Sequence, residues 1–439
     1  MEQQRPGGDE SRRVRRSAPT NAAAWASVAL LSVISVLSWV DRLIPSLLVT
    51  PIERDLGLTD AQFGLLLGLG FVGVYVLAGL PIAAALDRGR RKWILAGAVL
   101  LWCGSTVAAA FAPSFTVLLA TRSGVAIGEA ALMPAAISMI SDLFPPHRRR
   151  LPTALFMTIT ILGATGAYLI GGLVISAADQ IGVWRGLVPW RLSLIAVGLM
   201  GVPAAVVLML MREPPRSGSA TGSAGAAATW DHFRALAPLY FCLFTGSGLV
   251  LMMAQASGAW LPTLLTRGWH LSPAHTGAMM ALTFAPASAL GVALVSALAG
   301  RRAGRAAVMR LLTLALLVCV LSAPFAFAVR GDALTPLLAT GALAMLGQGS
   351  VATLNAMLVQ AVTPAAMRAR VMALFLTLMN LISTGLAPAA TAAVAGRLFG
   401  GPRALGGGLS VISAGGIAAG ALLILVALAW SRRREFTPA

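Results

Sequence analysis

Two carboxylates lie inside long apolar stretches of this sequence. Asp41 is within the run 25–49, and Glu129 is within the run 115–140, whereas the other acidic residues fall in tails, loops or helix ends. An ionisable group at the depth of a lipid bilayer is costly, so it indicates ion coupling, a proton relay or a substrate contact. These two residues are therefore the first candidates for chemistry.

Helix geometry sets the depth of these groups. Glu129 is about 20 Å from either end of a helix over 115–142, and Arg122 is about 10 Å deep on the same face. Asp41 is about 13 Å deep in the first helix, with Arg42 projecting about 100° away from it. We expect Asp41 and Arg122 to form an ion pair at one level. A purely structural buried pair is the alternative reading.

Glu129 has no obvious cation near it in the sequence. A carboxyl at the midplane loses its hydration, which favours the neutral form. Alternating exposure to the two sides would let it load a proton on one side and release it on the other. We expect Glu129, together with Asp41, to couple protons to the movement of a substrate.

The elements that must hold these residues are membrane helices. Of the 439 residues, 58% are hydrophobic and 11% are charged, and soluble domains carry about 25% charged residues. Runs of about 20 apolar residues span a bilayer as helices, whereas barrel strands are shorter and alternate in polarity. We predict twelve spans: 23–49, 61–86, 93–112, 115–142, 151–177, 190–211, 234–263, 274–299, 306–329, 334–361, 370–394 and 409–430.

The net charge of +18 is distributed in a way that argues against a nucleic-acid partner. With twelve spans, most of the 33 Lys and Arg residues fall on one side of the membrane, in 5–16, 88–92, 148–150, 212–234, 301–310, 368–370 and 432–434. The positive-inside rule places that side, with both termini, in the cytoplasm. We expect a multi-pass protein of the inner (plasma) membrane.

The chain repeats itself. The stretch 154–166 recurs as 373–385, and the same spacing pairs Glu129 with Gln348. A shorter repeat aligns Asp41-Arg42 with Gly258-Ala259, so the second half lacks these charges. We predict a basic tail (1–22), a six-helix half (23–212), a linker (213–233), a parallel six-helix half (234–430) and a tail (431–439).

Two helix starts also correspond between the halves. Thr59 with Gln62 fits a capping box before the second span. Ser272 followed by Pro273 fits an N-cap with proline at N1 before the eighth span.

The loop after the second span, Asp87-Arg88-Gly89-Arg90-Arg91, resembles the cytoplasmic loop motif of major facilitator transporters. The resemblance implies the major facilitator fold, all-α with twelve helices in two parallel halves. It also implies a conformational latch, for which we select Asp87, Arg88, Arg91 and Asp142. A basic loop that only sets topology is the alternative.

Within that superfamily the first half is similar to spinster-like transporters. The matching residues are Val40-Asp41-Arg42, the stretches 55–64 and 122–130, Asp142-Leu-Phe-Pro-Pro146 and Trp190-Arg191. The resemblance covers about residues 38–201, and it implies an amphipathic lipid substrate, of lysophospholipid or sphingoid phosphate type.

We expect the substrate's polar head to lie near Arg42, Arg122, Glu129 and Gln348, with its tail on apolar faces of the second half. Interhelical hydrogen bonding is the alternative for Gln348, Asn355 and Asn380. The expected partners are this substrate, protons and membrane lipids, and we expect a monomer.

The sequence contains no G-x-x-x-x-G-K-[ST] loop, no metal-ligand spacing and no catalytic triad. We therefore expect no cofactor, no metal and no enzyme. Uniport and proton-driven multidrug efflux remain open, and a membrane-embedded enzyme or sensor is the alternative outside the transporter class.

Overall fold

The computed structural model describes residues 21–214, 226–300, 304–364 and 367–433, and this part of the chain is helical. Most of the two predicted tails and about half of the predicted linker therefore lie outside the described residues. Within these described ranges, twelve helical spans are long and apolar enough to cross a membrane, as the sequence predicts.

The first six spans are α2 (Asn21–Leu47), α4 and α5 (Asp60–Leu67 and Leu69–Arg88), α6 (Arg91–Ala109), α7 and α8 (Phe115–Glu129 and Leu132–Leu143), α9 (Arg150–Ile181) and α10 (Pro189–Leu210). The next six are α12 (Ala237–Trp269), α13 (Pro273–Ala299), α14 (Gly304–Ala328), α15 and α16 (Leu334–Gln348 and Val351–Val362), α17, η2 and α18 (Arg368–Asn380, Leu381–Leu386 and Ala387–Leu398), and α19 (Ala404–Ser431). Shorter helices are α3 (Val49–Leu56), η1 (Pro146–Arg148) and α11 (Ala226–Ala235), which forms the last part of the predicted linker.

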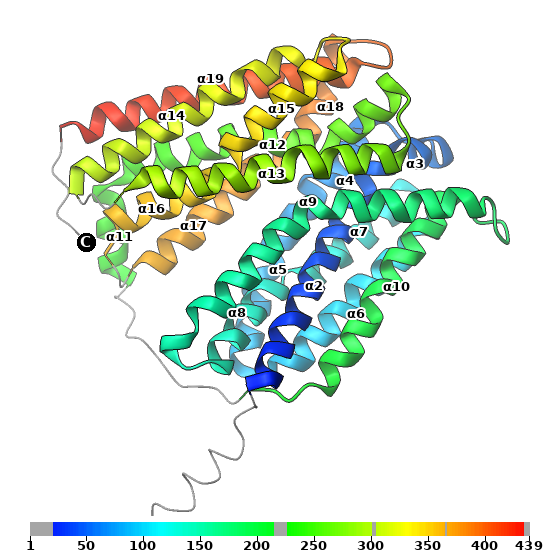
Figure 1. The fold of residues 1–439 in the computed structure, drawn as a ribbon, viewed down its shortest axis with the longest axis horizontal. Helices are drawn as coiled ribbons and strands as arrows, with labels where there is room; N and C mark the ends of the chain where they lie inside the picture. The colour runs from blue at the N-terminus through cyan, green and yellow to red at the C-terminus, as the bar shows by residue number, and fades with distance from the viewer. Residues whose placement is uncertain (1–20, 215–225, 301–303, 365–366, 434–439) are drawn as a thin grey trace, which may run out of the picture.

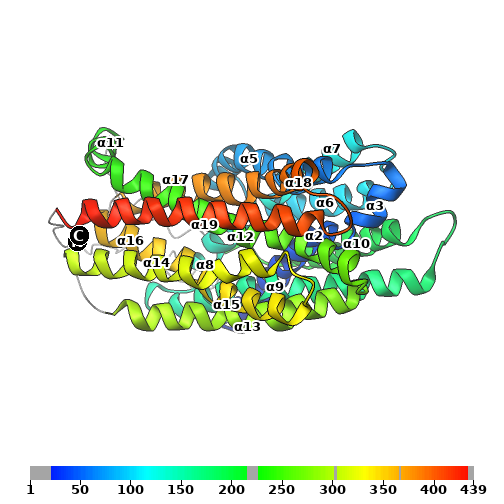
Figure 2. The ribbon, with the colours of Figure 1, turned by 90° about the horizontal axis from the view of Figure 1, so that it is seen from above.

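The two six-helix halves meet at one end and diverge at the other (Figure 1). Both views place α3 at one end and α11 with the last turns of α19 at the opposite end (Figures 1 and 2). Helix α9 packs on α13, α4 packs on α18, and α2 packs on α12. We call the end that carries α3 the closed end, and the end where α8 and α17 diverge the open end.

Glycines make the close crossings between the halves possible. A Cβ on Gly277 of α13 would lie 2.1 Å from the carbonyl oxygen of Tyr168 in α9. A Cβ on Gly68 would lie 2.3 Å from the carbonyl oxygen of Gly385 in η2. Small residues at such crossings let helix backbones approach closely, as is common inside membranes.

The repeat is visible in the helix interruptions. The fourth span, predicted as one helix, tightens after Glu129, where the Ala131 N–H donates to the Gly128 carbonyl at 3.2 Å. The tenth span tightens at the corresponding place, after Gln348, where the Ser350 N–H donates to the Gly347 carbonyl at 3.0 Å. Bonds to the third rather than the fourth preceding residue are a short 3₁₀ turn.

Both predicted helix starts are confirmed. The Thr59 side chain accepts from the Gln62 N–H, and the Gln62 side chain accepts from the Thr59 N–H. Ser272 accepts from the His275 N–H, with Pro273 in the first turn. These caps fix where α4 and α13 begin at the closed end.

Candidate substrate and proton site

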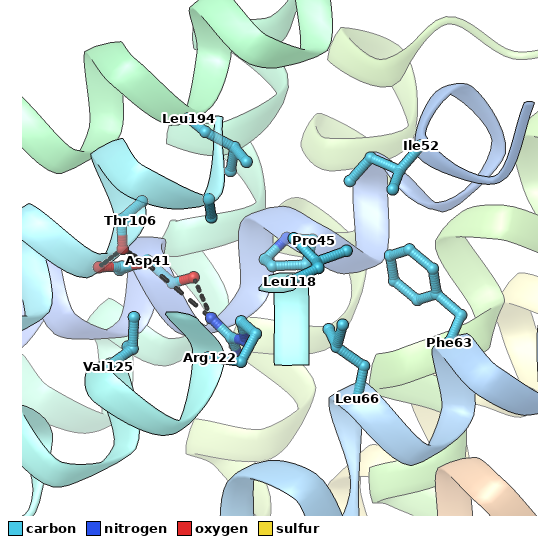
Figure 3. A pocket seen from close by; sticks show the side chains of 11 residues that line it. Asp41, Pro45, Ile52, Phe63, Leu66, Thr106, Leu118, Arg122, Val125 and Leu194 are labelled. Carbon is cyan, nitrogen blue, oxygen red and sulfur yellow. Dashed lines mark hydrogen bonds and ion pairs between the residues drawn. The ribbon is translucent and has the colours of Figure 1, made fainter. Parts of the chain in front are cut away.

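Asp41 is buried between α2, α6 and α7 (Figure 3). The Thr106 hydroxyl lies 2.7 Å from each carboxylate oxygen of Asp41. The Arg122 Nη1 atom is 4.0 Å from the Asp41 Oδ1 atom. The structure therefore brings Asp41 and Arg122 together at one depth, with Thr106 as a third member that the sequence analysis missed.

Pro45 explains why Arg122 reaches the backbone of α2 as well. Proline has no N–H, so the carbonyl four residues before it, that of Asp41, loses its helical donor. Arg122 donates from Nη1 to the Asp41 carbonyl and from Nη2 to the Arg42 carbonyl, both at 3.4 Å. One guanidinium therefore pairs with a carboxylate and donates to two backbone oxygens.

Glu129 does have a cation, so the expectation that none lies near it is wrong. Arg42 donates from Nε to the Glu129 Oε2 atom at 2.9 Å. Successive residues of a helix project about 100° apart, so Arg42 points away from Asp41 and toward the end of α7. The packing of α2 against α7 sets its contact with Glu129. The Glu129 side chain is fully buried, whereas 26% of the Arg42 side chain is exposed.

Aromatic rings surround the two guanidiniums. The Arg42 Cζ atom lies 4.9 Å from the Trp39 ring, 4.8 Å from Phe71 and 5.4 Å from Tyr75. The Arg122 Cζ atom lies 5.0 Å from the same Phe71 ring. Cation–π contacts of this kind stabilise a desolvated guanidinium by about 2 kcal/mol.

Two buried polar atoms of this group have no hydrogen-bond partner among the described residues: Glu129 Oε1 and Arg122 Nε. Leaving a buried polar atom unpaired costs about 1–3 kcal/mol. The four charges balance, with two carboxylates and two guanidiniums. The two unpaired atoms can still accept a proton or bind a ligand atom.

A cavity of about 280 Å³ lies between the two halves beside this group. Arg42 lines it together with residues from both halves, among them Trp39, Leu43, Phe71, Thr165, Tyr168, Gln255, Met280, Phe284, Asn380 and Thr384. Asp41 and Arg122 line a separate small cavity of about 10 Å³ (Figure 3), which is about the space of one water molecule. Arg42 thus connects the buried Glu129 to the larger cavity.

The second half contributes more polar groups to the cavity than the sequence analysis expects. Gln255 donates to the Thr384 hydroxyl, and Asn380 lies one turn earlier on the same span. The sequence analysis names Asn380 but misses Gln255 and Thr384. An amide inside the apolar seventh span is the signal that could have found Gln255.

Gln348 lies outside the lining of this cavity. It is buried, and it donates to the Val250 carbonyl at 3.0 Å and to the Ser322 hydroxyl at 3.1 Å. These bonds favour the alternative of interhelical hydrogen bonding, and its role in substrate binding stays a prediction.

The latch candidates separate into two groups at the open end. Arg91 donates from Nη1 to the Asp142 Oδ2 atom at 2.5 Å and from Nη2 to the Pro214 carbonyl at 3.0 Å. Asp87 and Arg88 are exposed at the end of α5. The structure thus brings Arg91 and Asp142 together with the start of the predicted linker.

Comparison with known proteins places this architecture in a family. The profile of the Major Facilitator Superfamily matches residues 30–388. The chain belongs to that superfamily. Its members are transporters rather than membrane-embedded enzymes, and the twelve helices agree with their fold.

Within the superfamily the chain is 31% identical over 285 residues to an MFS-type efflux pump of Mycolicibacterium smegmatis, covering 64% of each chain. It is 28% identical over 265 residues to Protein spinster of Drosophila melanogaster, covering 59% of this chain and 42% of that one. It is 31% identical over 261 residues to the sphingosine-1-phosphate transporter SPNS2 of Xenopus tropicalis, covering 57% and 48%. The match thus spans between 42% and 64% of these relatives' own length.

Among solved structures the fold is similar to a bacterial homolog of the human lysosomal transporter Spinster, in an inward-facing and unoccupied conformation. The TM-score is 0.79 at 24% sequence identity, covering 96% of this chain and all of that one. The nucleoside transporter NupG, in a D323A mutant, has the same fold with a TM-score of 0.72 at 12% identity, covering 92% of this chain and 99% of that one.

Proposed function

We propose that the protein is a proton-coupled secondary transporter that moves an amphipathic, lipid-like substrate by alternating access. The observation that carries the proposal is the bond between Arg42 and Glu129. Glu129 is fully buried, and one of its oxygens has no hydrogen-bond partner in the described part of the chain, while Arg42 lines the cavity between the halves. A proton on Glu129 and an anionic group in the cavity would therefore act on the same guanidinium.

The proposed coupling follows from charge balance. Protonation of Glu129 removes the negative charge that holds Arg42, and Arg42 then pairs with an anionic headgroup in the cavity. Loss of the proton restores the internal pair and releases the headgroup. A second proton-sensitive group lies beside this pair and consists of Asp41, Thr106 and Arg122. A proton on Asp41 would release Arg122 from its ion pair and let it shift.

The residues that line the cavity support an amphipathic substrate. Its ionic wall is Arg42, while Met280 and Phe284 supply apolar surface from the second half. Gln255 and Thr384 offer hydrogen bonds to a hydroxyl or amine on the headgroup. The similarity to spinster proteins, one of them named a sphingosine-1-phosphate transporter, supports a lysophospholipid or sphingoid phosphate.

We further propose that the protein lies in the inner membrane as a monomer with both termini in the cytoplasm. The positive-inside rule supports this orientation. The open end would then face the cytoplasm, and the closed end would face outward.

Proton-driven drug efflux is the second candidate, because one relative is named an MFS-type efflux pump. Transport in proteoliposomes with an imposed pH gradient distinguishes the candidates. We expect gradient-dependent movement of a labelled lysophospholipid or sphingoid phosphate. Movement of a cationic dye but of neither lipid would favour drug efflux. Lipid movement at a rate independent of the pH gradient would indicate uniport.

A further inference from the structure

One arginine joins the two halves at the closed end. Arg267, in the last turn of α12, donates from Nη2 to the Glu53 Oε2 atom at 2.5 Å and from Nη1 to the Asp60 Oδ1 atom at 2.8 Å. Its Nε atom donates to the Thr50 hydroxyl at 3.0 Å. Three donors of one second-half guanidinium are therefore used by three first-half side chains.

The acceptors lie on two separate elements. Thr50 and Glu53 belong to α3, which is anchored by the buried side chains of Val49 and Ile52. Asp60 is in the first turn of α4, whose start is fixed by the capping box. Because both elements are held to the first half, movement of α12 away from that half must break all three bonds.

Other ion pairs at this end stay within one half. Arg191 pairs with Asp55 at 2.8 Å inside the first half, and Arg403 pairs with Asp332 inside the second half. Among the described residues, the ion pairs that cross between the halves are those of Arg267 with Glu53 and Asp60. The crossing pairs are less exposed than the pair of Arg403 with Asp332, with 22% of the Arg267 side chain accessible compared with 37% for Arg403.

The charges of this group do not balance, because two carboxylates face one guanidinium. Burial, and next the nearby Asp60 carboxylate, raise the pKa of Glu53 to about 8, although Arg267 opposes the shift. The other charged or titratable groups that line the same open cavity are Arg54 and His270. The Glu53 Oε1 atom is buried without a hydrogen-bond partner in the described residues, so it is the position available to a proton.

We propose that Arg267, Thr50, Glu53 and Asp60 form a clasp that holds the closed end together, and that a proton on Glu53 strengthens the clasp. The proposal extends the alternating-access part of the proposed function to the gate opposite the open end. It assigns proton sensing to a group outside the membrane core, separate from Glu129 and Asp41.

The direction of the pH effect follows from linkage. In the closed state the pKa of Glu53 is raised to about 8, whereas an exposed Glu53 would have its ordinary pKa of about 4.3. The closed state therefore binds the proton more tightly. Its extra stability is complete below the ordinary value and is lost as the pH rises through about 8. One linked proton changes the closed-to-open ratio by at most about tenfold per pH unit.

Distance measurements between spin labels test the clasp without any substrate. Gln180 at the end of α9 and Leu398 at the end of α18 are exposed and belong to different halves. The native cysteines 103, 242 and 319 are buried, so cysteines introduced at these two positions take the label. The full-length protein is measured by double electron–electron resonance at pH 6, 7, 8 and 9.

We expect the short, closed-end distance to dominate at pH 6 and a longer distance to gain at pH 9, with at least a tenfold fall in the closed-to-open ratio. Glu53→Gln, which is neutral at every pH, should remain closed at pH 9. Arg267→Gln should favour the longer distance throughout, and Arg267→Lys should be intermediate. Arg403→Gln is the matched control, because it removes an arginine from the same end without touching a crossing pair, and it should behave like the unsubstituted protein.

A pH response in Glu53→Gln equal to that of the unsubstituted protein would overturn the proton-sensing role. Distances in Arg267→Gln equal to those in Arg403→Gln would overturn the clasp itself. Since the readout is conformation, a failure of proton-coupled transport at Glu129 would not produce either result, and the two proposals fail separately.

Discussion

Asp41 and Arg122 illustrate how a buried pair depends on more than its two charges. Arg122 also serves the carbonyl that Pro45 leaves without a donor, and Thr106 holds the carboxylate from the other side. Removing one partner of a buried pair strands a charge and costs about 3–5 kcal/mol. The consequences of single substitutions at this pair should therefore exceed the strength of the ion pair itself.

A double-mutant cycle measures this dependence. We expect Asp41→Asn and Arg122→Ala each to lower the free energy of unfolding by a few kcal/mol, while the double variant loses less than the sum. The expected coupling is about 0.5–3 kcal/mol, the range for residues that share a network. Thermal or denaturant unfolding in detergent supplies the values. Strictly additive losses would mean that the two residues do not interact.

Sequence reasoning finds these residues but not all their partners. The pair of Asp41 with Arg122 follows from matched depths, because depth is set by position along each helix. The bond of Arg42 to Glu129 depends on which helix lies beside α2, and spacing along one helix does not contain that information. The same limit hides Thr106, an ordinary polar residue in the third span.

At the scale of elements, two prolines at corresponding positions each leave one helix carbonyl without its backbone donor. Pro45 frees the carbonyl of Asp41, which Arg122 satisfies within the first half. Pro262 frees the carbonyl of Gly258 in the same way. The Tyr168 hydroxyl donates to that carbonyl at 2.8 Å, from the opposite half. The repeated proline therefore produces an internal bond in one half and a bond between halves in the other.

Tyr168→Phe tests the bond between the halves. The substitution leaves the Gly258 carbonyl without its donor, and we expect a loss of about 1 kcal/mol in the free energy of unfolding. Thermal unfolding of the purified protein reports the loss. Equal stability of Tyr168→Phe and the unsubstituted protein would show that the bond does not contribute.

Hydropathy predicts the twelve spans because burial in lipid demands long apolar helices. It does not predict the 3₁₀ turns after Glu129 and Gln348, or the π-helical stretch Leu381–Leu386. Those features change the twist of a helix without changing its mean hydropathy. The caps at Thr59 and Ser272 are predictable, because they need only local side chains.

At the scale of the whole molecule, the internal repeat predicts two parallel halves, and the distribution of basic residues predicts their orientation. The state of the molecule is not predictable from the sequence. Which end is closed depends on small differences between two sets of contacts, here the Arg267 clasp and the crossings at Gly68 and Gly277.

The cavity between the halves predicts that an apolar tail contributes to binding. A series of lysophospholipids with increasing chain length should give increasing thermal stabilisation of the purified protein. Each buried CH₂ group contributes about 0.8 kcal/mol at most. Stabilisation by sugars or amino acids, with no effect of chain length, would contradict the lipid assignment and favour a polar-nutrient carrier.

Substrate-driven proton movement tests the central claim most directly. Proteoliposomes with a pH-sensitive dye in the lumen are given a lysophospholipid gradient, and the change in lumenal pH is followed. We expect the unsubstituted protein and the exposed-site control Asp179→Asn to move protons with the lipid. Glu129→Gln should abolish proton movement while it retains exchange of labelled lysophospholipid. Proton movement in Glu129→Gln at the unsubstituted rate would contradict the account.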